Sequence, residues 1–153
     1  MSEAVSDSID ISAPADKVYA MVSDVTNMSQ WSPEQIKTRW TRGNTAPKVG
    51  ARFRGSNKNG WRRWSTSCKV TDATPGKRFA FRVSSYGLSV ADWSYEFDAI
   101  DGGCRVTEGT TDRRGWLIKT VGEPVTGVYD RDTHNLAGIR TTLAALKAAA
   151  EKS

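Results

Sequence analysis

Between residues 36 and 108 the sequence alternates apolar or aromatic residues with charged ones, and no other feature constrains the fold as strongly. Successive side chains of a β-strand point to opposite faces, so this pattern predicts strands with one apolar face and one wet face. Turn signals separate the runs at 57–60 (Asn-Lys-Asn-Gly), Pro75-Gly76 and 101–103 (Asp-Gly-Gly). Together with an alternating strand at 5–11, the runs predict a seven-stranded antiparallel sheet in an α+β fold.

The parity of the alternation assigns one set of side chains to an inner face. That set is Ile36, Thr38, Trp40, Ala51, Phe53, Gly55, Trp64, Thr66, Cys68, Val70, Phe79, Phe81, Val83, Trp93, Tyr95, Phe97, Val106 and Glu108. The outer face is mostly charged, with residues such as Arg52, Lys69 and Arg82. Such an asymmetric sheet needs a partner element that covers its apolar side.

After Asp112 the period of the apolar residues becomes helical. Residues 115–121 could form one helical segment, and a long helix is predicted from Val125 to about Ala150. Its apolar stripe consists of Val128, Leu136, Ile139, Leu143, Leu146 and Ala150. A helix of this length spans about 39 Å, which is enough to cross a whole sheet. It is therefore expected to lie on the aromatic face.

Two short helices are predicted directly after the first strand. Ser12 is a candidate N-cap for the first, and Asp24 is a candidate cap for the second, which ends near Trp31. This opening, from Ala13-Pro14-Ala15 to Trp31-Ser32-Pro33, resembles the entry to the helix-grip fold of the START-like (SRPBCC) superfamily, in particular its polyketide cyclase/dehydrase-like branch. Residues 49–53, 93–97, 103–108 and 142–147 extend the resemblance over nearly the whole chain.

The resemblance implies a single START-like domain over 1–153, with a curved sheet wrapped around a long C-terminal helix. It also implies a hydrophobic cavity that opens near one end of that helix. Members of this superfamily bind lipids, sterols, polyketides, quinones or plant metabolites, and a minority catalyse cyclisation or dehydration. Because the polyketide cyclase label is often attached by similarity alone, the resemblance does not by itself make the chain an enzyme.

Composition and charge limit the classes of partner. The chain has a net charge of +5, which suits an anionic ligand, a membrane surface or nucleic acid without choosing between them. No apolar run approaches the roughly 20 residues that cross a bilayer, and the N-terminus lacks a signal-peptide pattern.

One histidine and two separated cysteines, Cys68 and Cys104, do not make a standard metal site, and no cofactor is expected. The cysteines are predicted to be buried reduced thiols of a cytoplasmic protein. Nothing indicates an oligomeric state.

The aromatic residues of the inner face are the candidate walls of a ligand cavity, because small-molecule sites are mostly apolar pockets with a few polar groups. The candidates are Phe53, Trp64, Phe79, Phe81, Trp93, Tyr95 and Phe97. Ile139 on the helix faces them. The opposite interpretation is a solid core. The small residues near the helix end, such as Ala144 and Ala148, favour a cavity because they fill little volume.

A polar turn at the start of the helix supplies the other candidates. Arg131, Asp132 and Asn135 could form the polar end of the pocket, or could lie at its solvent-wet end and bond to loops. His134, the only histidine, is a weak candidate for acid–base catalysis because it lies beside the inward stripe. Glu108 is a second weak catalytic candidate and needs a partner if it is buried. Arg62 could be that partner, although both side chains are expected to sit at strand ends and reach water.

The sequence is compatible with three functions, which are given from the most to the least favoured. The first is binding of an apolar or amphipathic small molecule without catalysis. The second is a polyketide aromatase/cyclase or dehydratase that uses the same pocket, with His134 or Glu108 moving a proton. The third is a protein- or nucleic-acid-interaction module that uses the basic hairpin at 52–64, where cations alternate with aromatic residues. The third is the least favoured, because the parity points Phe53 and Trp64 inward.

Overall fold

The computed structural model describes residues 5–85, 87–114, 124 and 131–152. Its helices are α1 (Ala15–Ser23), the 3₁₀ helix η1 (Val25–Gln30) and α3 (Arg131–Lys152). Its strands are β1 (Val5–Ile11), β2 (Gln35–Thr41), β3 (Arg52–Asn59), β4 (Arg62–Thr74), β5 (Arg78–Ser85), β6 (Leu88–Ile100) and β7 (Gly103–Asp112).

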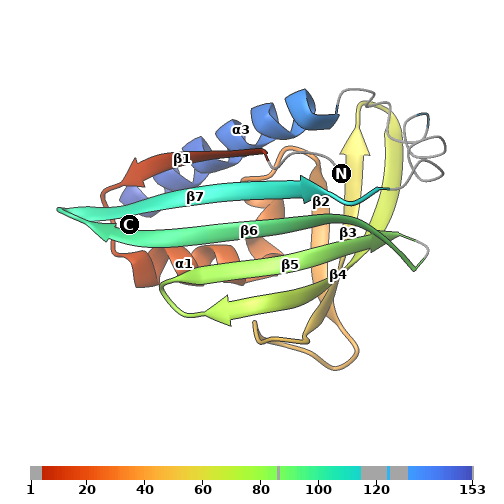
Figure 1. The fold of residues 1–153 in the computed structure, drawn as a ribbon, viewed down its shortest axis with the longest axis horizontal. Coiled ribbons are helices and arrows are strands. Elements are labelled where there is room, and N and C mark those ends of the chain that lie inside the picture. Colours follow the sequence, from red (N-terminus) through yellow and green to blue (C-terminus); the bar gives the residue numbers. More distant parts are fainter. Residues whose placement is uncertain (1–4, 86, 115–123, 125–130, 153) are drawn as a thin grey trace.

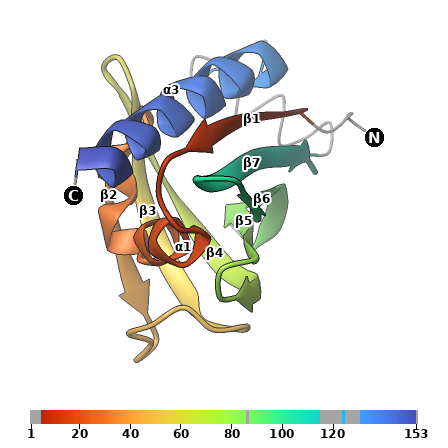
Figure 2. The same cartoon turned by 90° about the vertical axis from the view of Figure 1, so that its left-hand side faces the viewer.

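The described strands form one seven-stranded antiparallel sheet in the order β1-β7-β6-β5-β4-β3-β2. The sheet curves around α1, and α3 lies across it, packed mainly along β1 (Figures 1 and 2). This is the predicted helix-grip arrangement, and the predicted meander is confirmed. From β2 to β7 each strand pairs with the next one along the chain, with a longer loop at 42–51 between β2 and β3, and β1 completes the sheet by pairing with β7.

Both predicted short helices are present, and the predicted N-cap is wrong for α1 and confirmed for η1. Ser12 does not cap α1, since the helix begins at Ala15 behind Pro14 and has no side-chain cap. The Ser12 backbone N–H instead donates to the Glu151 carboxylate at the end of α3 (2.8 Å). Asp24 does cap η1, because its carboxylate accepts the backbone N–H of Thr26 (3.2 Å).

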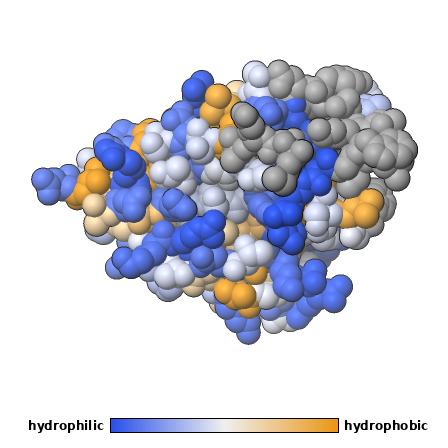
Figure 3. Space-filling view, in the orientation of Figure 1, coloured by the Kyte–Doolittle hydropathy of each residue, from blue (hydrophilic) through white to orange (hydrophobic). Residues whose placement is uncertain are grey.

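The two faces of the sheet follow the predicted parity except at the start of β2. There a bulge lies between Gln35 and Lys37 and breaks the alternation. Ile36, expected on the inner face, is therefore turned outward and is 43% exposed, whereas Thr38 is buried. The outer face over β5, β6 and β7 is largely hydrophilic (Figure 3). Arg82 and Asp92, opposite one another on β5 and β6, form an ion pair on this face (2.8 Å).

On α3 the predicted apolar stripe is buried from Ile139 onward, whereas Leu136 is only partly buried. Ile139, Leu143, Leu146 and Ala150 are buried, while Val128 and the segment 115–121 lie outside the described residues. Cys68 and Cys104 are buried free thiols. None of the helices in the described ranges is both long and apolar enough to cross a membrane.

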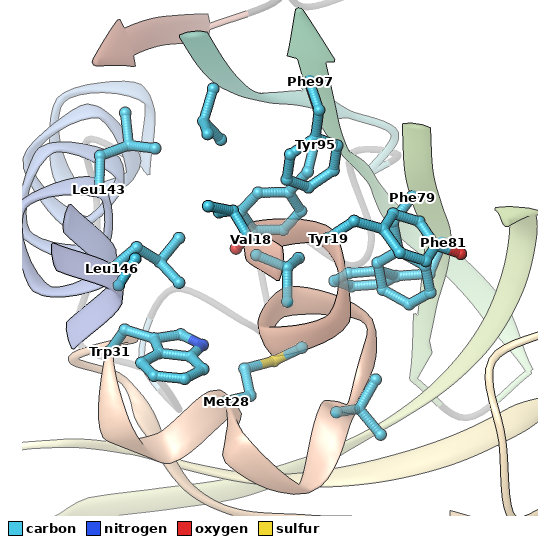
Figure 4. Close-up of a cluster of buried hydrophobic side chains, with 14 of the residues drawn as sticks. Val18, Tyr19, Met28, Trp31, Phe79, Phe81, Tyr95, Phe97, Leu143 and Leu146 are labelled. Atoms are coloured by element: carbon cyan, nitrogen blue, oxygen red, sulfur yellow. The ribbon is translucent and has the colours of Figure 1, made fainter. Parts of the chain in front are cut away.

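One part of the interior is packed solid where α1 enters the curve of the sheet (Figure 4). We call this part the filled half, and it consists of Val18, Tyr19, Trp31, Phe79, Phe97, Leu143 and Leu146. The Tyr19 ring packs edge-on against Phe79 and Phe97, with centroid distances of 6.4 and 5.7 Å. Edge-to-face pairs of this kind are favourable beyond the area that they bury.

Candidate functional site

Beyond the filled half, the interior is hollow. A cavity of about 890 Å³ lies between the inner face of the sheet and α3. It extends to the β5–β6 turn, where Gly87 and Leu88 belong to its wall and are exposed. We call this part of the molecule the hollow half. Its volume falls within the range of about 300–1,000 Å³ that is typical of small-molecule sites.

Most of the side chains that the sequence singled out belong to the wall of this cavity. From the sheet these are Phe53, Trp64, Phe81, Trp93, Tyr95 and Glu108, and from α3 they are Arg131, His134 and Asn135. Phe53 and Phe81 pack edge-on at 5.1 Å and form a continuous aromatic surface across β3 and β5. The structure thus brings residues from five strands and one helix to one space.

Four of the predicted ligand-binding residues do not line the cavity. Phe79 and Phe97 are buried against Tyr19 in the filled half, because α1 occupies the space in front of them. Ile139 is 1% exposed and belongs to the same core cluster. Asp132 is exposed to solvent in the first turn of α3.

The most unusual polar group in the wall is Glu108. It is 3% exposed, and its Oε2 atom accepts a hydrogen bond of 2.7 Å from the Tyr95 hydroxyl. The two residues are direct partners in the β6–β7 register, which places both side chains on the inner face. Burial raises the pKa of Glu108 to about 8, although the Tyr95 hydrogen bond opposes the rise. The carboxyl group is therefore mostly protonated at neutral pH.

This geometry corrects the expectation that Glu108 reaches water at a strand end, whereas Arg62 is the first residue of β4 and is partly exposed, as expected. Glu108 is paired with Tyr95 inside the protein and not with Arg62. The Arg62 guanidinium lies over the Trp61 ring at 4.5 Å, and its Nε donates to the Pro124 carbonyl (3.1 Å). Burial and the Glu108 carboxylate together raise the pKa of Tyr95 well above its ordinary value.

The polar turn of α3 is held by a residue that sequence reasoning missed. Glu34, just before β2, accepts from Arg131 (2.9 Å) and lies 3.4 Å from the His134 ring nitrogen. All three residues belong to the cavity wall. Asn135, one residue further, is buried in the same wall. The only signal in the sequence was a carboxylate directly after Trp31-Ser32-Pro33, which does not reveal a partner 97 residues away.

A second polar cluster, also missed, surrounds Gly55 on the β2–β3–β4 side. Asn57 is 4% exposed and donates from its amide to Thr66 Oγ1 (3.2 Å). Gln35 Oε1 and Thr38 Oγ1 are buried there without a hydrogen-bond partner among the described residues. A Cβ atom on Gly55 would lie 3.0 Å from Gln35 Oε1, so the glycine leaves the room that this cluster occupies. Strand parity placed Thr66 and Thr38 inward but could not show that they meet.

Two further features limit the chemistry of the cavity. Burial raises the pKa of the Cys68 thiol to about 12, so this wall residue is protonated and a poor nucleophile. Asp112 and Arg114 form an ion pair of 2.8 Å in the wall, with side chains that are 7% and 9% exposed. No group of three or more metal-ligating side chains occurs among the residues that the structure describes. What the arrangement offers is an apolar space with a neutral acid and two hydroxyl- or amide-bearing regions.

Known proteins share both this fold and this sequence pattern. Residues 2–151 match the family model described as polyketide cyclase/dehydrase and lipid transport. The solution structure of the polyketide cyclase-like protein Cgl2372 from Corynebacterium glutamicum is 30% identical with a TM-score of 0.66, over 99% of this chain and 94% of that chain. A search of the curated proteins found no match.

Two more distant structures share the fold. The protein CV1439 from Chromobacterium violaceum has a TM-score of 0.72 at 12% identity, over 98% of this chain and 99% of that one. The di-domain aromatase/cyclase StfQ from the steffimycin biosynthetic pathway has a TM-score of 0.74 at 15% identity, over 97% of this chain and 50% of that chain. With the match to the family model over nearly its full length, the chain belongs to the polyketide cyclase/dehydrase and lipid transport family.

Proposed function

We propose that the protein binds an apolar or amphipathic small molecule, of the lipid, quinone or polyketide-like class, in the cavity between the sheet and α3. The observation that carries this proposal is the cavity of about 890 Å³ with its aromatic wall. The family description includes lipid transport, and StfQ is an aromatase/cyclase of a biosynthetic pathway. Both are consistent with an apolar ligand.

The physical chemistry of the wall supports binding. Burial of apolar surface contributes about 25 cal/mol per Å², so a ligand that buries about 300 Å² gains roughly 7 kcal/mol before the cost of association is subtracted. Phe53, Phe81 and Trp93 supply this apolar surface. Polar groups at Glu108, at Asn135 and around Gly55 would orient the ligand.

The test is a fluorescence titration with N-phenyl-1-naphthylamine, an uncharged apolar probe, on the protein and on two variants of Gly138. This glycine belongs to the cavity wall on α3, and the nearest atom to an added Cβ is Pro33 Cγ at 3.8 Å. The Gly138→Leu variant should fill the space and weaken probe binding at least tenfold, while Gly138→Ala, which adds only a methyl group, should change it little. Absence of saturable binding to the unmodified protein would refute the proposal.

A second function, aromatase/cyclase or dehydratase activity, is favoured by one specific observation. Glu108 is a neutral buried acid beside a cavity that can hold a folded poly-β-ketone. In a cyclisation with loss of water, it would donate its proton to the departing hydroxyl group, and the carboxylate so formed would take up the proton lost from the adjacent carbon, which restores the acid. Turnover of a poly-β-ketone thioester to an aromatic product, lost in Glu108→Gln and retained in His134→Ala, would support this role. The reverse pattern would assign the proton transfer to His134.

A further inference from the structure

Glu108 lies where the cavity borders the filled half. In the sheet register, Glu108 is opposite Tyr95, and Tyr95 is opposite Phe79. Phe79 is fully buried against Tyr19 of α1, so this row of residues forms the boundary between the filled half and the hollow half. The wall also reaches the β5–β6 turn, where Leu88 is 50% exposed.

The carboxyl group of Glu108 has one satisfied oxygen and one unsatisfied oxygen. Oε2 accepts the Tyr95 hydroxyl hydrogen at 2.7 Å. Oε1 is buried and has no hydrogen-bond partner among the described residues. Buried polar atoms are almost always hydrogen-bonded, so an unpaired oxygen in a cavity wall marks a position where a water molecule or a ligand can complete the hydrogen bonding.

The role of Oε1 follows from where the proton of the neutral acid resides. Since Oε2 already accepts from Tyr95, the acid proton belongs on Oε1, which then acts as a donor. A donor in the wall of an apolar cavity pairs with an acceptor that has little charge. A carbonyl oxygen meets this requirement, and an ammonium group does not, because it has no acceptor.

We propose that Glu108 donates a hydrogen bond from Oε1 to a ketone or quinone carbonyl of the ligand, while Tyr95 holds the carboxyl group through Oε2. The inference rests on the proposed binding function and names the polar group that the cavity selects. The ligand accordingly lies with its carbonyl at Glu108, and its apolar body lies against Phe81 and Trp93.

The charged groups around Glu108 leave it as the only acid in position for this role among the described residues. On β1, Asp7 is opposite Glu108 in the register, and its carboxylate is paired with Arg140 of α3 at 2.9 Å. From β6 the facing titratable group is Tyr95, and from α1 it is Tyr19, which lies behind Phe79.

Further along the wall, the ionisable side chains pair with one another. Glu34 is within 3.5 Å of both Arg131 and His134, and Asp112 is within 2.8 Å of Arg114. None of these carboxylates has a buried oxygen without a hydrogen-bond partner. Among the described residues, the buried side-chain oxygens that lack a partner belong to Gln35, Thr38, Glu108 and Thr110.

The experiment uses four ligands with one three-ring frame, which are 9-fluorenone, fluorene, 9-hydroxyfluorene and 9-aminofluorene. Calorimetric or fluorescence titration at pH 6 gives the affinity ratio of fluorenone to fluorene in the unmodified protein and in Glu108→Leu. Because the variant lacks the donor, we expect its ratio to be about tenfold lower. Thermal unfolding of each variant checks that it is folded.

The Glu108→Gln variant supplies the matched control and keeps the test valid if Glu108→Leu does not fold. Its amide still donates to a carbonyl but does not ionise, so it should retain the preference for fluorenone at pH 6 and at pH 9.5. In the unmodified protein the preference should be lost as pH rises through about 8, because the ionised carboxylate no longer donates. The infrared carbonyl stretch of bound fluorenone should move to lower frequency in both proteins at pH 6.

Several outcomes would overturn the inference. Equal ratios in the unmodified protein and Glu108→Leu, with an unshifted carbonyl stretch, would show that Glu108 does not contact the ligand while leaving the binding function intact. Tighter binding of 9-aminofluorene than of fluorenone would show that the site selects a cation. If none of the four ligands showed saturable binding, the proposed binding function would fail together with the inference.

Discussion

The filled half and the hollow half are built from the same strands and the same kind of residue, yet one is packed and the other is open. On β5, Phe79 lies in the filled half and Phe81 lies in the cavity wall, only two residues further along the same face. On β6, Phe97 and Tyr95 differ in the same way. The aromatic face of the sheet therefore does not determine whether a region is packed or open.

What decides it is the element opposite the sheet. Helix α1 enters the curve of the sheet and brings Val18 and Tyr19 against Phe79 and Phe97 (Figures 2 and 4). In the hollow half the facing residues on α3 are Asn135, Gly138 and Thr142, which are polar or lack a side chain. A core element thus completes one half, and a ligand is expected to complete the other.

The largest effect should come from truncating the filled half. Phe79→Ala removes a fully buried ring where α1 cannot close the gap, so the free energy of unfolding should fall by about 3–5 kcal/mol. Trp93→Ala, in the wall of the hollow half, should cost less because the ring is only partly buried and borders open space. Urea unfolding of both variants measures the difference. Equal losses of unfolding free energy in the two variants would show that the two halves do not differ in packing.

The next effect concerns the pH dependence of stability. In the unfolded chain, Glu108 ionises near its ordinary pKa of 4.5, whereas the folded protein keeps it neutral up to about 8. Folding therefore takes up a proton between these values, and the free energy of unfolding should fall as pH rises from about 5 to 8. The slope is up to about 1.4 kcal/mol per pH unit and disappears above pH 8.

Urea unfolding across this pH range checks the slope with two variants. Glu108→Gln should lack this component, while Glu96→Gln, at an exposed position on the outer face of β6, should keep it. Parallel profiles for the unmodified protein and Glu108→Gln would contradict the description of Glu108 as a buried neutral acid.

A smaller effect, of opposite sign, is expected from replacing the glycine of α3 that borders the hollow half. Gly138→Ala should raise the free energy of unfolding by about 1 kcal/mol, because alanine favours the helix interior more than glycine does. An added Cβ would not clash, since the nearest atom, Pro33 Cγ at 3.8 Å, is at an ordinary contact distance. Thermal denaturation measures the change. A loss of stability would show that this part of the cavity wall is already packed.

The smallest effect should come from the tip of the basic hairpin. Trp61 is 80% exposed and contacts mainly the Arg62 guanidinium. We expect Trp61→Ala to change the free energy of unfolding by no more than about 0.5 kcal/mol and to leave probe binding unchanged. Salt-dependent binding to single-stranded oligonucleotides that is lost in this variant would identify the hairpin, and not the cavity, as the functional region.

Much of the fold could be predicted because the alternation of residues reports directly on the two faces of a sheet. Parity placed Phe53, Phe81 and Tyr95 inside, and a 3.6-residue stripe placed Leu143 and Leu146 on the buried side of α3. The failure at Ile36 has a local cause. A bulge adds one residue to β2 and reverses the faces, and nothing in Gln35-Ile36-Lys37 signals it.

The candidate site could be predicted only in part, because parity gives the face of a residue and not its neighbours. It could not separate Phe79 from Phe81, since that depends on where α1 ends in space. The pairing of Glu108 with Tyr95 depends on the register of β6 and β7, which alternation leaves undetermined. Glu34 is positioned by its ion pair with Arg131 of α3, which is distant in sequence. Asn57 is positioned by its hydrogen bond to Thr66 across the β3–β4 hairpin.

The central claim is that the hollow half, and not the filled half or the hairpin tip, receives the ligand. The tryptophans are spread over these regions, with Trp64 and Trp93 in the cavity wall, Trp31 in the filled half and Trp61 at the tip. Their indole N–H resonances, assigned by single Trp→Phe substitutions, can be followed during titration with N-phenyl-1-naphthylamine. We expect large, saturable shifts at Trp64 and Trp93 and little change at Trp31 and Trp61. Shifts centred on Trp61 or Trp31, with Trp64 and Trp93 unmoved, would contradict it.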